Sequence, residues 1–94
     1  MSRKEFIDKL TAQLKKWDTE IEKLETNAKS ASAELKADYN QQIQELRSKK
    51  ATARDKLGEV KRASEEAWKE LRSGAEKAFD EMKNTFDRVV AKFK

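Results

Sequence analysis

The chain has 94 residues and a net charge of +4, and 43% of its residues are charged while 36% are hydrophobic. It contains no His and no Cys, which excludes imidazole catalysis, Ser–His and Cys–His dyads, His-containing zinc sites and disulfides. Two Gly, no Pro and abundant Ala, Glu, Lys, Leu and Arg are typical of long helices and coiled coils, so we predict an all-α fold.

Residues 7–35 carry an unbroken apolar repeat. Its steps alternate between three and four residues, which is the a/d pattern of a coiled coil. Residues 26–33 (TNAKSASA) are weak helix formers, but a loop would normally reset the phase of the repeat, so we predict that the helix continues through them. The repeat consists of Ile7, Leu10, Leu14, Trp17, Ile21, Leu24, Ala28, Ala31 and Leu35.

A turn is predicted at the middle of the chain, in RSKKATARD (47–55). Lys50 falls on the apolar seam, where a charge is unfavourable, and Thr52 to Asp55 matches a capping box. The expected architecture is one domain, 1–94, folded as a long antiparallel helical hairpin with a first helix at 3–47, a turn at 48–52 and a second helix at 53–93. Two alternatives stay open: one continuous helix in an antiparallel dimer, and a three-helix bundle with breaks near 28–32 and near Gly58.

Positive charge is concentrated in residues 47–62, which hold seven basic and two acidic side chains. Such a run could contact the phosphates of nucleic acid or lipid. It lacks aromatic residues that would stack on bases, and basic residues also solvate a turn, so nucleic-acid binding is not expected. This basic patch consists of Arg47, Lys49, Lys50, Arg54, Lys56, Lys61 and Arg62.

The last helix is expected to carry a broad apolar face. Its apolar side chains fill an arc of about 100–120°, which is wider than one neighbouring helix covers. We predict that this face is buried between helices and in part between molecules, with Trp68, Phe79, Met82, Phe86 and Phe93 as the interface residues. A hairpin alone has little core, so we expect dimerisation into a helical bundle. A lipid or polymer-granule surface is the alternative partner for the same face.

Three segments resemble a group of small bacterial coiled-coil proteins without an assigned biochemical function: FIDKLTAQLKKWDTEIEKLE, ELRSKK and EEAWKELRSGAEKAFDEM. The resemblance spans nearly the whole chain and implies a helical, non-catalytic protein, without supplying site residues. The 3-4-4 apolar spacing of the last part of the chain is similar to the eleven-residue repeats of exchangeable apolipoproteins, which favours the lipid-surface alternative.

From these features we expect a non-enzymatic structural or interaction protein that acts through helix–helix oligomerisation. Peripheral binding of a lipid or granule surface is the alternative function, and no cofactor or metal is expected. The first residues are charged throughout and lack the apolar run of a signal peptide, and no stretch is apolar enough to span a membrane. We therefore expect a soluble, cytoplasmic protein.

Overall fold

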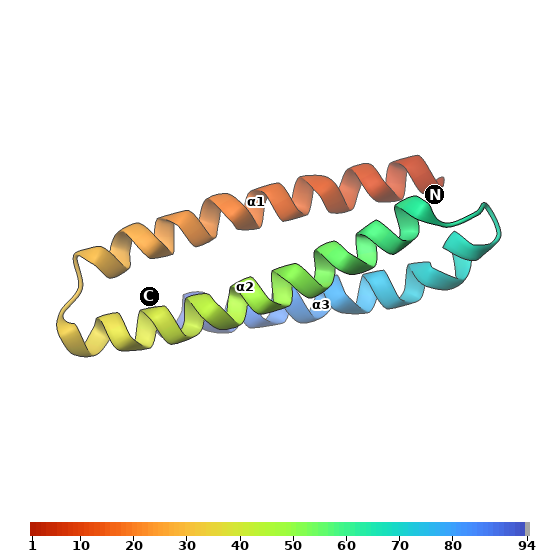
Figure 1. Cartoon of the computed structure of the whole chain (residues 1–94). Coiled ribbons are helices and arrows are strands. Elements are labelled where there is room, and N and C mark those ends of the chain that lie inside the picture. The colour runs from red at the N-terminus through yellow and green to blue at the C-terminus, as the bar shows by residue number, and fades with distance from the viewer. Residues whose placement is uncertain (94) are drawn as a thin grey trace.

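The computed structural model describes residues 1–93, which form three helices: α1 (Arg3–Lys29), α2 (Ala33–Arg62) and α3 (Ala67–Phe93). They lie side by side in a rod of 51 × 19 × 17 Å, with α1 and α3 parallel to each other and α2 antiparallel to both (Figure 1). The predicted all-α fold is confirmed, and no strand occurs in residues 1–93.

The structure corrects the predicted hairpin. Residues 48–52 lie inside α2, so the helices predicted at 3–47 and 53–93 are replaced by three, and the chain turns at 30–32 and at 63–66. The three-helix alternative is the arrangement observed. Its first break was placed correctly, whereas the second lies beyond Gly58, which is an interior residue of α2.

Lys50 and Thr52, which supported the predicted turn, both have partners inside the bundle. Lys50 lies at the seam between helices and pairs with Asp18 of α1, so its side chain is only 12% exposed. Thr52 Oγ1 donates a hydrogen bond to the Ser48 carbonyl one turn earlier (3.2 Å). This is a bond of a residue in the interior of a helix, so Thr52 does not cap a helix start. A lysine is tolerated at this seam because α1 supplies the opposite charge.

A serine precedes each helix and caps its first turn. The side chains of Ser2, Ser32 and Ser64 each accept a hydrogen bond from the backbone N–H three residues later, at 3.2, 3.4 and 3.2 Å. Each bond satisfies a donor that the helix itself leaves free. At 30–32 these local bonds, with the weak helix formers around them, interrupt the helix that the repeat predicts.

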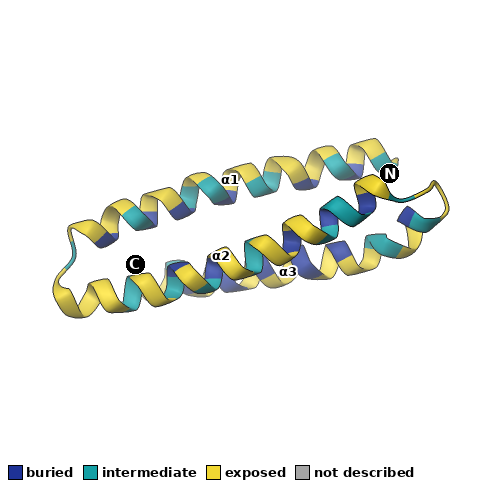
Figure 2. Cartoon of the chain, viewed as in Figure 1, coloured by how far each residue is buried: buried dark blue, intermediate teal, exposed yellow. Residues whose placement is uncertain are grey.

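A single hydrophobic core runs along the rod, and the buried residues of all three helices face one another (Figure 2). The repeat predicted the core side of α1 well, since Leu10, Trp17, Ile21, Leu24 and Ala28 are buried. Leu35 is 48% exposed, because α1 has already ended where the last step of the repeat falls. The largest fully buried side chains are Ile21, Leu46, Val60, Met82 and Val89.

The two parallel helices, α1 and α3, meet mainly through large side chains, whereas α2 packs closely against both. Arg3 pairs with Glu65 at 2.9 Å, 62 residues later in the chain. Two aromatic pairs join residues with the same separation: Phe6 with Trp68 and Trp17 with Phe79, with ring centroids 6.1 and 5.6 Å apart. The parallel register is thus fixed by one ion pair and two ring contacts.

Candidate interaction surfaces

The five predicted interface residues lie on α3 and face the other two helices of the same chain. Trp68, Phe79 and Met82 are buried, and Phe86 and Phe93 are partly buried against the core. The apolar arc is too wide for one helix, as the sequence indicates, but α1 and α2 of the same chain together cover it. Because this face is covered within one chain, it gives no reason to expect dimerisation.

Both ends of this apolar face are closed by stacked or tilted rings. Phe93, at the C-terminal end of α3, stacks on Tyr39 of α2 with ring centroids 3.9 Å apart and planes 9° from parallel. At the other end Trp68 packs against Phe6, and the guanidinium of Arg72 lies 5.4 Å from the centre of the Phe6 ring. The buried Trp68 indole nitrogen has no hydrogen-bond partner among residues 1–93. These contacts make α3 a core helix and leave little of its apolar face to a partner.

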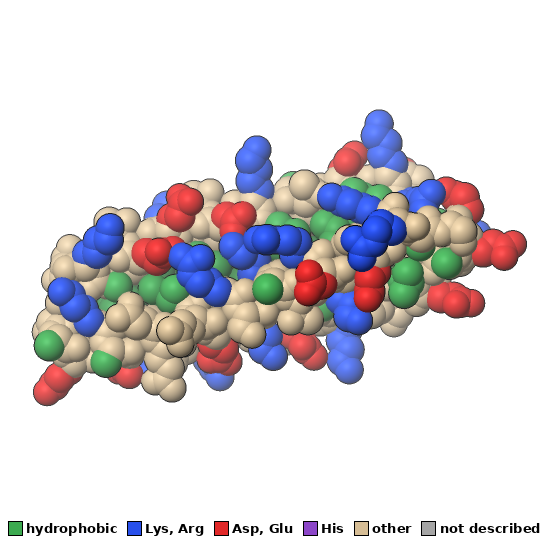
Figure 3. All heavy atoms as spheres, viewed as in Figure 1, with side chains coloured by type: hydrophobic (Ala, Val, Ile, Leu, Met, Phe, Trp, Pro, Cys, Tyr) green, Lys and Arg blue, Asp and Glu red, His purple; other side chains and the backbone are tan. Residues whose placement is uncertain are grey.

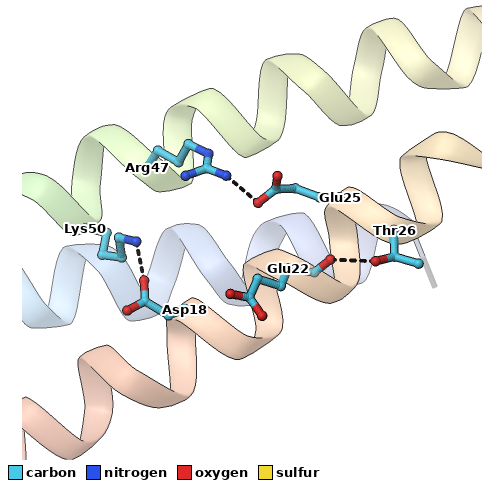
Figure 4. Close-up of polar contacts among 6 residues, drawn as sticks. All are labelled: Asp18, Glu22, Glu25, Thr26, Arg47 and Lys50. Atoms are coloured by element: carbon cyan, nitrogen blue, oxygen red, sulfur yellow. Dashed lines mark hydrogen bonds and ion pairs between the residues drawn. The ribbon is translucent and has the colours of Figure 1, made fainter.

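The basic patch is not one surface. Residues 47–62 wrap around α2 because successive side chains on a helix are rotated by about 100°. Arg47 and Lys50 therefore reach α1, where they pair with Glu25 and Asp18 (Figure 4), whereas Lys49 reaches α3 and lies 3.9 Å from Glu81.

Ion pairs neutralise more than half of the patch. Besides Arg47, Lys49 and Lys50, Lys56 pairs with Glu59 at 3.6 Å. Among residues 1–93, no acidic oxygen lies within 4.0 Å of the side-chain nitrogens of Arg54, Lys61 and Arg62, so these three keep an uncompensated charge. The face formed by α1 and α2 accordingly shows basic and acidic side chains interspersed (Figure 3).

An open hollow of about 510 Å³ lies between α1 and α2 near their connection. Ala28 of α1 and Ile43 of α2 are the buried apolar residues that line it. The rim includes Lys36, Asn40 and Gln44, all exposed. We call this feature the α1–α2 hollow; the sequence did not predict it, because its two sides come together only when the chain turns at 30–32.

In residues 1–93, the part of the chain that the structure describes, no group of three acidic side chains is placed to hold a metal ion. None of its helices combines the length and apolar character needed to cross a membrane. No protein-family model, curated protein or solved structure matches the chain.

The bundle has two features that the sequence did not predict. The apolar repeat predicts that the seam of α1 begins at Ile7, but Phe6 is the buried residue and Ile7 is only partly buried. The sequence could have indicated Phe6, because Phe6, Leu10 and Trp17 are four and seven residues apart and so lie on one face of a helix. The parallel pairing of α1 with α3 carried no local signal, because the paired residues lie 62 positions apart in the sequence. The predicted hairpin also contains no parallel helices.

Proposed function

We propose that this protein is a non-enzymatic interaction protein that binds another helix along the seam between α1 and α2. The α1–α2 hollow is the observation that carries the proposal. It combines an apolar floor, Ala28 and Ile43, with a rim of exposed polar side chains that can donate and accept hydrogen bonds.

A helix is the partner whose shape suits this surface. The hollow lies between two antiparallel helices, and an amphipathic helix binds such a groove through apolar residues spaced three and four apart. Leu35 lies in the first turns of α2, where every residue from 32 to 37 is exposed, and adds an apolar side chain at the same end of the rod (Figure 2).

The alternative of lipid-surface binding has less support. The aromatic face of α3 that would enter a lipid surface is inside the bundle, where Trp68, Phe79 and Met82 are buried. Binding to lipid through this face requires the helices to separate and the core to be exposed.

A pair of matched variants tests the proposed surface. Asn40→Trp places a large side chain on the rim of the hollow, and Asn84→Trp places the same side chain on an exposed position of α3. We expect Asn40→Trp to lose a helical protein that the wild-type chain captures, while Asn84→Trp captures it like wild type. Equal behaviour of the two variants, or loss of binding only in Asn84→Trp, would refute the assignment of the hollow.

A further inference from the structure

We infer that this chain also forms a dimer by exchanging α1, with the α1–α2 connection straightened into one continuous helix. The inference goes beyond helix binding at the α1–α2 hollow and does not depend on it, and the partner is a second copy of the chain. In the exchanged dimer α1 of one molecule packs against α2 and α3 of the other, and all contacts of α1 described above re-form between molecules.

The backbone of the connection is close to helical already. Ser30 has φ −94° and ψ −3°, in the right-handed helical region, and Ser30 N and Ala31 N still bond to the carbonyls three residues earlier, both at 3.2 Å. Ser32 has a helical φ of −63° and an extended ψ of 162°. Rotation of that ψ to about −42° brings Ser32 into the helix. The connection contains no Gly or Pro, and no residue of 1–93 has a positive φ, so no left-handed residue opposes a continuous helix.

The apolar stripes of α1 and α2 stay in phase across the connection. Ala28 and Leu35 belong to the same three-and-four repeat, and two further steps of four residues lead from Leu35 to Tyr39 and Ile43 of α2. A straightened helix would therefore carry the core side of α1 and the core side of α2 on one face. An exchange needs this property, because each half of the long helix must present its apolar side to the partner molecule.

The register between α1 and α2 places an exposed apolar residue near the two-fold axis of such a dimer. Asp18 lies opposite Lys50, and Glu25 opposite Arg47. The midpoint between residues 18 and 50 is residue 34, and the midpoint between residues 25 and 47 is residue 36. A continuous helix would therefore cross the same helix of the second copy near residue 35. Leu35, 48% exposed in the single chain, would then pack against Ala31 and Leu35 of the other copy. Its burial adds a contact that the monomer lacks.

The second connection is a less suitable hinge. Arg3 donates hydrogen bonds to the Ala63 carbonyl and to Glu65, so the N-terminus of α1 holds residues 63–66 in place. Exchange of an identical element at a short connection is a low-cost route to a dimer, since it replaces contacts within one chain by the same contacts between two.

Refolding at different protein concentrations, followed by size-exclusion chromatography, tests the exchange. We expect the dimer fraction to rise with the concentration at which the protein is refolded. Ala33→Pro should remove the dimer and leave the monomer folded, because Pro is accepted at the first position of α2 but not inside a continuous helix. The association constant should fall by roughly 100-fold or more for each hinge. Ala33→Gly is the matched control and should retain dimer, and Leu35→Lys should weaken only the dimer.

Energy transfer within one chain distinguishes exchange from ordinary dimerisation. Dyes on Lys4→Cys and Lys61→Cys lie near each other in the monomer, because Arg3 contacts Ala63, but about 85 Å apart on a continuous helix. In a dimer of one labelled and one unlabelled chain we expect transfer to be lost. A dimer that keeps efficient transfer, or that survives Ala33→Pro, would overturn the exchange and leave the proposed helix-binding function standing. A chain that stays monomeric after refolding at millimolar concentration would also overturn it.

Discussion

Truncation of Phe79 should destabilise the single folded chain. Phe79 is 4% exposed and packs on Trp17 across the α1–α3 contact, with ring centroids 5.6 Å apart. Removal of a buried Phe ring costs about 3–5 kcal/mol, which includes the cavity it leaves. Since 1 kcal/mol shifts Tm by roughly 4–8 °C in a domain of this size, Phe79→Ala should lower Tm by at least about 12 °C.

Thermal and urea unfolding followed by circular dichroism measure this effect. A double-mutant cycle with Trp17→Ala should give a coupling of about 0.5–1.5 kcal/mol for the ring pair. Leu35→Ala is the control, because Leu35 is exposed and its truncation should change stability by less than about 0.5 kcal/mol.

The dependence of Tm on protein concentration tests whether this core is built within one chain. Unfolding of a core built within one chain does not depend on concentration, whereas a core built between chains makes Tm rise with concentration. After refolding at micromolar concentration, where the monomer is the expected form, we expect a constant Tm for wild type and Phe79→Ala. A Tm that rises with concentration, or a loss below about 1 kcal/mol in Phe79→Ala, would refute the intrachain packing of this ring.

Three further outcomes are expected. Gly74→Ala should stabilise the protein by about 0.5–1 kcal/mol in urea unfolding, because a Cβ at this helical position meets nothing within 4 Å; a destabilised variant would contradict it. Asp18→Ala should cost about 1–2 kcal/mol, because it leaves the largely buried Lys50 unpaired, whereas Glu20→Ala, which removes an exposed pair with Lys23, should cost less than about 0.5 kcal/mol; equal losses would contradict the seam assignment of Lys50. The folded protein should not float with liposomes at physiological salt, and flotation would favour the lipid-surface alternative.

The sequence by itself determined that the chain is helical and which side of most of it is apolar. Helix propensity and hydrophobic periodicity are local properties, so they can be read from neighbouring residues. The repeat from Ile7 to Ala28 predicted the buried side of α1, and the arc on α3 predicted that Trp68, Phe79 and Met82 would be buried. The width of that arc also indicated more than one covering helix, although not that both belong to the same chain.

The tertiary structure decided where the chain turns and what each apolar face contacts. A continuous repeat is compatible with one long helix, a hairpin or a bundle, because all three bury the same stripe. Small free energies can choose between these three arrangements, since a serine cap contributes about 1 kcal/mol. Ser32 caps the first turn of α2, and the chain turns at 30–32 although the repeat continues. Lys50 shows the same dependence, since its stability at the seam comes from Asp18, 32 residues earlier, which only the folded chain brings close.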